Sequence, residues 1–141
     1  MPDAPAELQA APVELDDVPV LYRACADFPD AIGATWRTFE TAVGLRGRKF
    51  YGFFDPVVGE YRVCVRTQPG DDPAALEAQE GTIPGGRYLR VRLHGEAVAM
   101  YSQIAPTFEQ MERMADVDPG RPFIEYYRRS DRVDLMVPIK G

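Results

Sequence analysis

Residues 122–139 have the sequence PFIEYYRRSDRVDLMVPI, and this segment gives the strongest indication of the fold. Apolar and polar residues alternate on both sides of residues 130–131, as in two antiparallel strands joined by a tight turn. One residue breaks the apolar pattern. Glu125 shares a strand face with Phe123 and Tyr127, because successive side chains of a strand point to opposite faces. The stretch therefore predicts a hairpin that carries a carboxylate among aromatic rings.

The order strand, helix, strand, strand occurs twice along the chain. Strand-like segments alternate in apolar and polar residues, and helical ones repeat apolar residues every three or four positions. The segments are 18–26, the helix after Pro29, 49–54 and 61–66, and then 86–95, 97–115, 122–129 and 132–139. We therefore predict an α+β fold of two β-α-β-β units. Six strands should form one antiparallel sheet with both helices on one face, a pseudo-twofold axis and a ligand cleft between the halves.

The division of the chain follows from composition. Residues 1–12 are rich in Ala and Pro and predict a flexible tail before a single domain at 13–141. Within it, repeat one covers about 13–67, a polar linker 68–82 and repeat two about 83–140. Pro106 lies inside the second helical segment and should kink it or begin a new helix there.

Composition excludes several classes of function. The chain has 141 residues and a formal net charge of −6, which disfavours direct binding to nucleic acid or to an anionic membrane. It has no apolar run long enough to cross a bilayer and no signal peptide pattern, so we expect a cytoplasmic protein. His94, Cys25 and Cys64 are too few and too far apart for a metal site, a disulfide framework or a catalytic triad. We expect no metal and no cofactor.

Glu125 is the strongest candidate for a functional residue. A carboxylate on an aromatic face is costly to bury unless it is paired, hydrogen-bonded or protonated. The alternatives are that this face is solvated, or that Glu125 pairs with Arg128 or Arg90. Tyrosine and tryptophan rings near Glu125 would suit a flat or cationic molecule. The candidate ligand-binding residues are Glu125, Tyr127, Trp36, Phe39, Tyr51, Tyr101 and Phe108.

Three motifs in the second half resemble the GyrI-like effector-binding family. They are IPGGRY at 83–88, HGE at 94–96, and PFIEYY at 122–127 followed by VDLMVPI at 133–139. The resemblance implies the duplicated fold and places Glu125 in a ligand pocket with aromatic residues around it. Members of this family bind lipophilic cations and aromatic compounds, either fused to DNA-binding domains or as free-standing proteins. The present chain is similar to a free-standing member.

The resemblance favours a protein that binds a small hydrophobic, aromatic or cationic drug or metabolite, for sequestration, sensing or resistance. One alternative is a hydrolase of strained, cyclopropane-bearing electrophiles. Glu125 would then act as general base or acid, and Tyr127 or Tyr51 would donate a hydrogen bond to a developing oxyanion. A second alternative is a module that inhibits a protein partner, as yet unknown, through its acidic surface.

Overall fold

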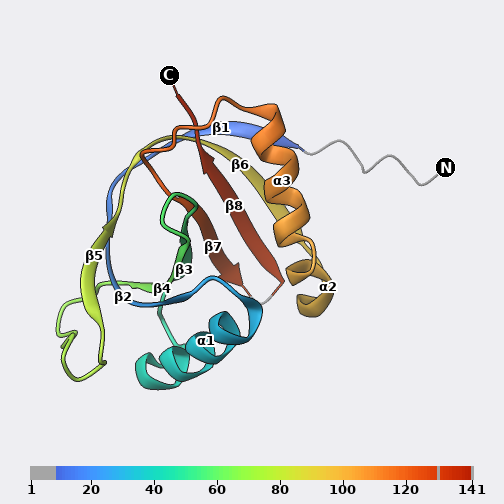
Figure 1. Cartoon of the computed structure of the whole chain (residues 1–141). Coiled ribbons are helices and arrows are strands. Elements are labelled where there is room, and N and C mark those ends of the chain that lie inside the picture. The colour runs from blue at the N-terminus through green and yellow to red at the C-terminus, as the bar shows by residue number, and fades with distance from the viewer. Residues whose placement is uncertain (1–8, 130, 141) are drawn as a thin grey trace.

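The computed structural model describes residues 9–129 and 131–140, and its strands form one antiparallel sheet (Figure 1). The strand order is β1-β6-β8-β7-β3-β4-β2-β5. The elements in chain order are β1 (Ala10–Leu15), β2 (Val18–Ala26), α1 (Pro29–Val43), β3 (Phe50–Asp55), β4 (Glu60–Arg66), β5 (Gln79–Ile83), β6 (Gly86–His94), α2 (Ala97–Tyr101), α3 (Ile104–Met114), β7 (Phe123–Arg129) and β8 (Arg132–Pro138). The predicted α+β fold is confirmed.

The middle of the sheet has the symmetry expected of a duplicated unit. From the centre outward, the first half contributes β3, β4 and β2, and the second half contributes β7, β8 and β6. These strands occur in the same chain order in the two units, strand-helix-strand-strand. The two halves meet where β3 pairs with β7, and in this pairing Gly52 lies opposite Glu125. The centre of the sheet is therefore shared by both halves.

Two strands were not among the six predicted. β1 pairs with β6 at one edge of the sheet, and β5 pairs with β2 at the other. Ala10 pairs with Val91 and Tyr22 with Gln79, so the paired residue numbers add up to 101 along both ladders. β1 and β2 together with β5 and β6 thus form one long two-stranded ribbon that runs from one edge of the sheet to the other.

This ribbon corrects two predicted boundaries. Residues 10–12 of the predicted tail belong to β1, and residues 79–82 of the predicted linker belong to β5. Residues 1–8 of that tail lie outside the described part of the chain. Between its two ladders, the backbone at Leu15–Asp17 approaches Gly85 so closely that a β-carbon at Gly85 would overlap it.

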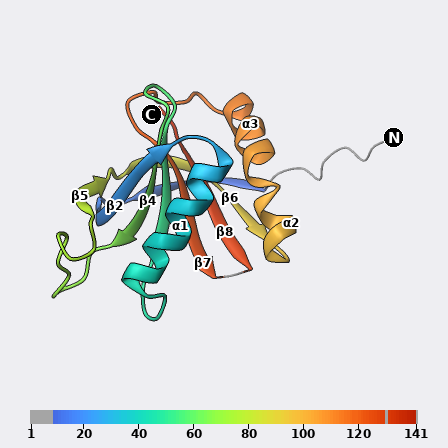
Figure 2. The ribbon, with the colours of Figure 1, turned by 60° about the horizontal axis from the view of Figure 1, so that its bottom comes forward.

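All helices cover the same face of the sheet, as predicted (Figure 2). Phe39 of α1 packs on the side chains of β2, β3 and β4, while Met100 and Met111 of α2 and α3 pack on β6, β7 and β8. Pro106 lies in the first turn of α3, which begins a new helix after α2 ends at Tyr101. The Pro106 prediction is therefore confirmed, because the first turn of a helix does not need the N–H that proline lacks.

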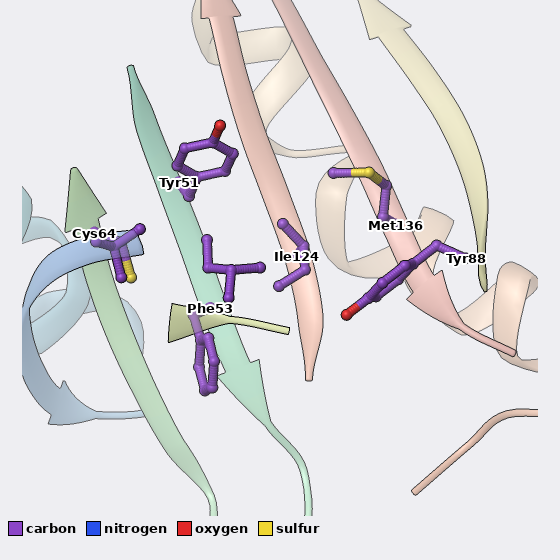
Figure 3. Close-up of a cluster of buried hydrophobic side chains, with 8 residues drawn as sticks. Tyr51, Phe53, Cys64, Tyr88, Ile124 and Met136 are labelled. Atoms are coloured by element: carbon purple, nitrogen blue, oxygen red, sulfur yellow. The ribbon is translucent and has the colours of Figure 1, made fainter. Parts of the chain in front are cut away.

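The opposite face, which we call the ribbon face, carries a second core. Its members come from alternate positions of the same strands. Figure 3 shows six of them: Tyr51, Phe53, Cys64, Tyr88, Ile124 and Met136. Val13, Leu15 and Val18 of the ribbon pack against this cluster. The central strands are thus buried on both faces, which explains why the burial of β3 and β8 shows no two-residue period.

Candidate functional site

Glu125 lies at the centre of the sheet on the helix face, with 8% of its surface exposed. Two tyrosine hydroxyls donate hydrogen bonds to the same carboxylate oxygen, Oε1. The Tyr61 hydroxyl lies 2.7 Å from it and the Tyr127 hydroxyl 2.6 Å. Tyr61 belongs to the first half of the chain and Tyr127 to the second. The carboxylate is therefore held by donors from both halves, and neither of these bonds uses Oε2.

Gly52 provides the space for this arrangement. It lies between Glu125 on β7 and Val63 on β4, on the same face as both side chains of the Tyr61–Glu125 hydrogen bond. A β-carbon at Gly52 would overlap the Tyr61 hydroxyl and Glu125 Oε1. The absence of a side chain at this position lets the hydroxyl reach across β3 to the carboxylate.

Aromatic rings from two helices approach the carboxylate from outside the sheet. The Trp36 ring of α1 meets the Tyr127 ring edge to face at 5.2 Å, and the Tyr101 ring at the end of α2 does so at 6.1 Å. Trp36 also donates from Nε1 to the Tyr61 hydroxyl at 3.2 Å. Tyr101 keeps 46% of its surface exposed. The rings therefore connect the buried carboxylate to the surface of the molecule.

Within the described residues, no basic side chain forms an ion pair with Glu125. Arg128, one of the two alternative partners, instead pairs with Asp134 at 3.4 Å. Arg90, the other, lies on the ribbon face, since its neighbours Leu89 and Val91 pack on the helix face. The interpretation of Glu125 as half of an ion pair with Arg128 or Arg90 is therefore wrong.

Burial controls the protonation of this cluster. It raises the pKa of Glu125 above the usual carboxyl value, and the hydrogen bonds from Tyr127 and Tyr61 oppose that rise. Burial also raises the pKa of Tyr61 and of Tyr127 well above the usual value, and the neighbouring carboxylate adds to both increases. Both tyrosines thus remain hydrogen-bond donors at any physiological pH.

The structure brings four of the other predicted residues to this face of the sheet. Trp36 and Tyr101 contact Tyr127, and Phe108 packs on Phe123 with 5.4 Å between ring centroids. Phe39 is completely buried, with Arg23 stacked 5.2 Å from its ring. Its contacts are therefore those of a packing residue beneath α1.

The placement of Tyr51 beside Glu125 is wrong. Tyr51 lies on the ribbon face, where its ring stacks on Tyr126 at 4.7 Å, because it is one residue away from Gly52 and adjacent residues of a strand face opposite ways. Tyr51 lines a cavity of about 310 Å³, which lies on the ribbon face. None of the other predicted ligand-binding residues lines it.

Tyr61 and Gly52 were not among the predicted site residues. Both could have been found from patterns in the sequence. Tyr61 begins the alternating segment that faces the helices together with Val63 and Val65, and a buried hydroxyl in such a row needs a partner. Gly52 is a lone glycine among four aromatic residues of a strand, which often marks a close approach of another group.

The described residues contain no cluster of three or more His, Cys, Asp and Glu side chains that could hold a metal ion. In the same part of the chain, no helix is both long enough and apolar enough to span a bilayer.

Comparisons with known proteins show the fold alone. No protein-family model matches the sequence, and no curated protein sequence matches it closely. Solved structures do match. An integron cassette protein from the mobile metagenome of Vibrio cholerae superposes with a TM-score of 0.68 at 17% identity, covering 94% of this chain and 97% of that one.

Two further solved structures also superpose on this chain. SAV2435, solved bound to tetraphenylphosphonium, has a TM-score of 0.66 at 15% identity, with 95% of both chains covered. A hydrolase from Listeria innocua has a TM-score of 0.54 at 10% identity, covering 93% of this chain and 91% of the other. Proteins of this fold thus include one that binds a lipophilic cation.

Proposed function

We propose that this chain is a GyrI-like small-molecule-binding protein, and that it binds a lipophilic aromatic cation against Glu125. One observation carries the proposal. Glu125 is a buried carboxylate held by two tyrosine hydroxyls, and no basic residue of the described chain neutralises it. Most buried carboxylates have a positive partner, because an isolated charge away from water is costly. A bound cation would supply that missing charge.

The surrounding rings favour the same class of ligand. Trp36, Tyr101 and Tyr127 offer aromatic surface within one cluster, and aromatic faces attract cations and stack on flat molecules. The tyrosine hydroxyls hold Glu125 in position by bonds to Oε1, so the carboxylate does not need to reorganise when a ligand arrives. The likeness of fold to a protein solved with tetraphenylphosphonium supports this choice of ligand class.

Tetraphenylphosphonium and tetraphenylborate form a matched test pair, because they share size and shape and differ in the sign of their charge. We expect Glu125→Gln to lower the affinity for tetraphenylphosphonium roughly ten- to hundredfold, because it removes a charge-assisted contact of about 1.5–3 kcal/mol. Tetraphenylborate should bind the variant at least as well as the wild type. Isothermal titration calorimetry measures both.

Glu80→Gln is the matched control, since it removes the same charge from an exposed position on the edge strand β5. It should leave both affinities unchanged. The proposal fails if Glu125→Gln and Glu80→Gln behave alike, or if tetraphenylborate loses as much affinity as tetraphenylphosphonium in the Glu125 variant.

A hydrolase is the second candidate, and one feature of the site favours it. Glu125 has a raised pKa, as general acids and bases at neutral pH often do, and it lies 2.6 Å from the Tyr127 hydroxyl, a hydrogen-bond donor. In that case Glu125 would accept a proton from water, and the Tyr127 hydroxyl would turn its one proton from Glu125 to the substrate to stabilise negative charge there. Glu125→Gln would then abolish turnover of a cyclopropane-bearing electrophile and leave binding of the neutral substrate nearly intact. Product analysis measures the turnover.

A further inference from the structure

The ribbon face carries a cavity that the proposed function does not use. It lies where the long ribbon crosses the sheet, between Leu15 and Val18 of the ribbon and Ile124 and Met136 of the central strands. Its volume of about 310 Å³ is at the lower end of the range for small-molecule sites. Three of its lining residues, Tyr51, Ile124 and Met136, are labelled in Figure 3.

Among the polar side chains that line this cavity, hydrogen-bond donors outnumber carboxylates. Three arginines line it, namely Arg66, Arg90 and Arg128, together with Tyr51 and Tyr126. All five can donate hydrogen bonds, and a guanidinium group cannot accept one. The lining of the cavity is therefore rich in donors.

Of the three acidic residues that line the cavity, one is neutralised by arginine side chains and another accepts a backbone hydrogen bond. Asp134 is 3% exposed and pairs with Arg92 at 3.3 Å and with Arg128 at 3.4 Å. Asp17 accepts a hydrogen bond of 2.6 Å from the backbone N–H of Gly85. The third carboxylate, Asp16, is exposed to water, as is Arg66, so solvent screens both of these charges.

Two arginines of the cavity remain available. Within the described residues, neither Arg66 nor Arg90 forms an ion pair. Arg66 is close enough to the Tyr51 hydroxyl to lower its pKa, although burial raises that pKa more, so Tyr51 stays protonated. Two guanidinium groups without an ion-pair partner, those of half-buried Arg90 and exposed Arg66, thus share the cavity lining with the Tyr51–Tyr126 pair. The rings of that pair lie 4.7 Å apart and nearly parallel.

We propose that this cavity is a second binding site, separate from Glu125, for a small aromatic carboxylate. The carboxylate of the ligand would take the place beside Arg66 and Arg90, since the planar guanidinium fork matches a carboxylate in geometry and charge. The flat ring would lie against Ile124 and Met136, beside the two tyrosines. The two faces of the sheet would then bind ligands of opposite charge.

The probe for this site is 2-naphthoate, with 2-naphthalenemethanol as its neutral counterpart of the same shape. For a ligand of this size we expect 2-naphthoate to bind the wild type with a Kd below about 1 mM. The neutral alcohol should bind at least tenfold more weakly. The double variant Arg66→Gln/Arg90→Gln should weaken 2-naphthoate at least tenfold and leave the alcohol unchanged.

Two controls separate this site from the first. Arg113→Gln removes a positive charge from α3, on the other side of the sheet, and should not change 2-naphthoate binding. Glu125→Gln should not weaken it either, and saturating tetraphenylphosphonium should not displace it. The inference is overturned if 2-naphthoate binds the double variant as tightly as the wild type, if it fails to bind the wild type, or if tetraphenylphosphonium displaces it.

A measurement on the wild type keeps the test valid if the double variant does not fold. In nuclear magnetic resonance spectra, 2-naphthoate should shift the ring signals of Tyr51 and Tyr126 and leave those of Trp36 and Tyr127 in place. The reverse pattern would put the carboxylate at the Glu125 site and refute the second site. Failure of tetraphenylphosphonium to bind would refute only the first proposal, because the two faces share no ligand contact in this scheme.

Discussion

Two buried carboxylates lie on adjacent strands of the same sheet, and each is stabilised in a different way. Asp134 on β8 faces the ribbon and has two arginines as ion-pair partners. Glu125 on β7 faces the helices and has two tyrosine hydroxyls. Hydrogen bonds from tyrosine satisfy the lone pairs of a carboxylate but do not cancel its charge. The comparison therefore separates a charge that the protein itself neutralises from one that has no cationic partner in the described part of the chain.

This difference also explains why burial alone is a poor guide to function. Asp134 is more deeply buried than Glu125, with 3% of its surface exposed against 8%. Its partners Arg92 and Arg128 are held in place by the sheet, so the ion pair contributes to the packing of the ribbon face. Glu125 faces the aromatic rings of Trp36 and Tyr101 through Tyr127 instead. The two carboxylates therefore differ in their partners more than in their depth.

The sharpest test of the comparison is to neutralise each carboxylate in turn. Asp134→Asn should lower the free energy of unfolding by about 2 kcal/mol at pH 8, because Arg92 and Arg128 lose their counter-charge while remaining partly hydrated. Glu125→Gln should leave it unchanged within about 0.5 kcal/mol or raise it, because the variant removes a buried charge without a cationic partner and keeps an oxygen for both tyrosines. Urea denaturation measures both values.

One outcome would contradict this expectation. If Glu125→Gln destabilises the protein as much as Asp134→Asn does, the charge of Glu125 is already compensated within the chain, and the reason for proposing a cationic ligand disappears.

The second prediction concerns the space that Gly52 leaves open. Gly52→Ala should lower the free energy of unfolding by about 1–3 kcal/mol, because the new methyl group overlaps the Tyr61 hydroxyl and Glu125 Oε1 and forces one of them to move. It should also weaken tetraphenylphosphonium, since the carboxylate loses a donor that positions it. Urea denaturation and calorimetry on the same variant measure the two effects.

Gly33→Ala is a suitable control for Gly52→Ala. Gly33 lies within α1, where a β-carbon would make only an ordinary contact with the flexible end of Arg37. Alanine is the better helix former, so this variant should be as stable as the wild type or slightly more stable. Equal stability of Gly52→Ala and the wild type would show that the Tyr61–Glu125 hydrogen bond does not depend on the glycine.

Much of the fold could be predicted from periodicity, and the errors have a common physical cause. The repeated order of elements, the shared helix face and the new helix near Pro106 follow from local patterns. The strands β1 and β5 escaped prediction because they are edge strands with few large apolar residues, and they exist through pairing with segments about 60 to 80 residues away. Local composition contains little information about such pairing.

The candidate site also combines features that follow from local sequence patterns with features that depend on the pairing of distant segments. Glu125 and Tyr127 could be placed on one face, because they are two residues apart on one strand. The side of β3 could not be assigned, since Phe50, Tyr51, Gly52 and Phe53 are all buried and the strand has no polar face to fix its orientation. Tyr51 was therefore chosen in place of Tyr61. Only the pairing of Gly52 with Glu125 resolves that choice.

The smallest expected effect is a dependence of stability on pH. Burial raises the pKa of Glu125 in the folded chain above its ordinary value of 4.5. Protonation then favours the folded state, so the contribution of Glu125 to the free energy of unfolding is fully present below the ordinary pKa. It is lost as pH rises through the interval up to the raised pKa, and it is constant beyond. In the Glu125→Gln variant this contribution is absent, because a glutamine side chain does not titrate.

The difference in free energy of unfolding between wild type and Glu125→Gln isolates this contribution, because the other titrating groups are common to both proteins. It should fall by at most about 1.4 kcal/mol per pH unit as pH rises from about 4.5, and then level off. Urea denaturation of both proteins between pH 4 and pH 8 provides the measurement. Saturating tetraphenylphosphonium should make the fall in the wild type smaller, because a cation beside the carboxylate lowers its folded-state pKa back toward the ordinary value, at which the fall begins. A difference that stays constant or rises with pH would mean that the hydrogen bonds from Tyr61 and Tyr127 outweigh burial, and that Glu125 is stable as an anion without any ligand.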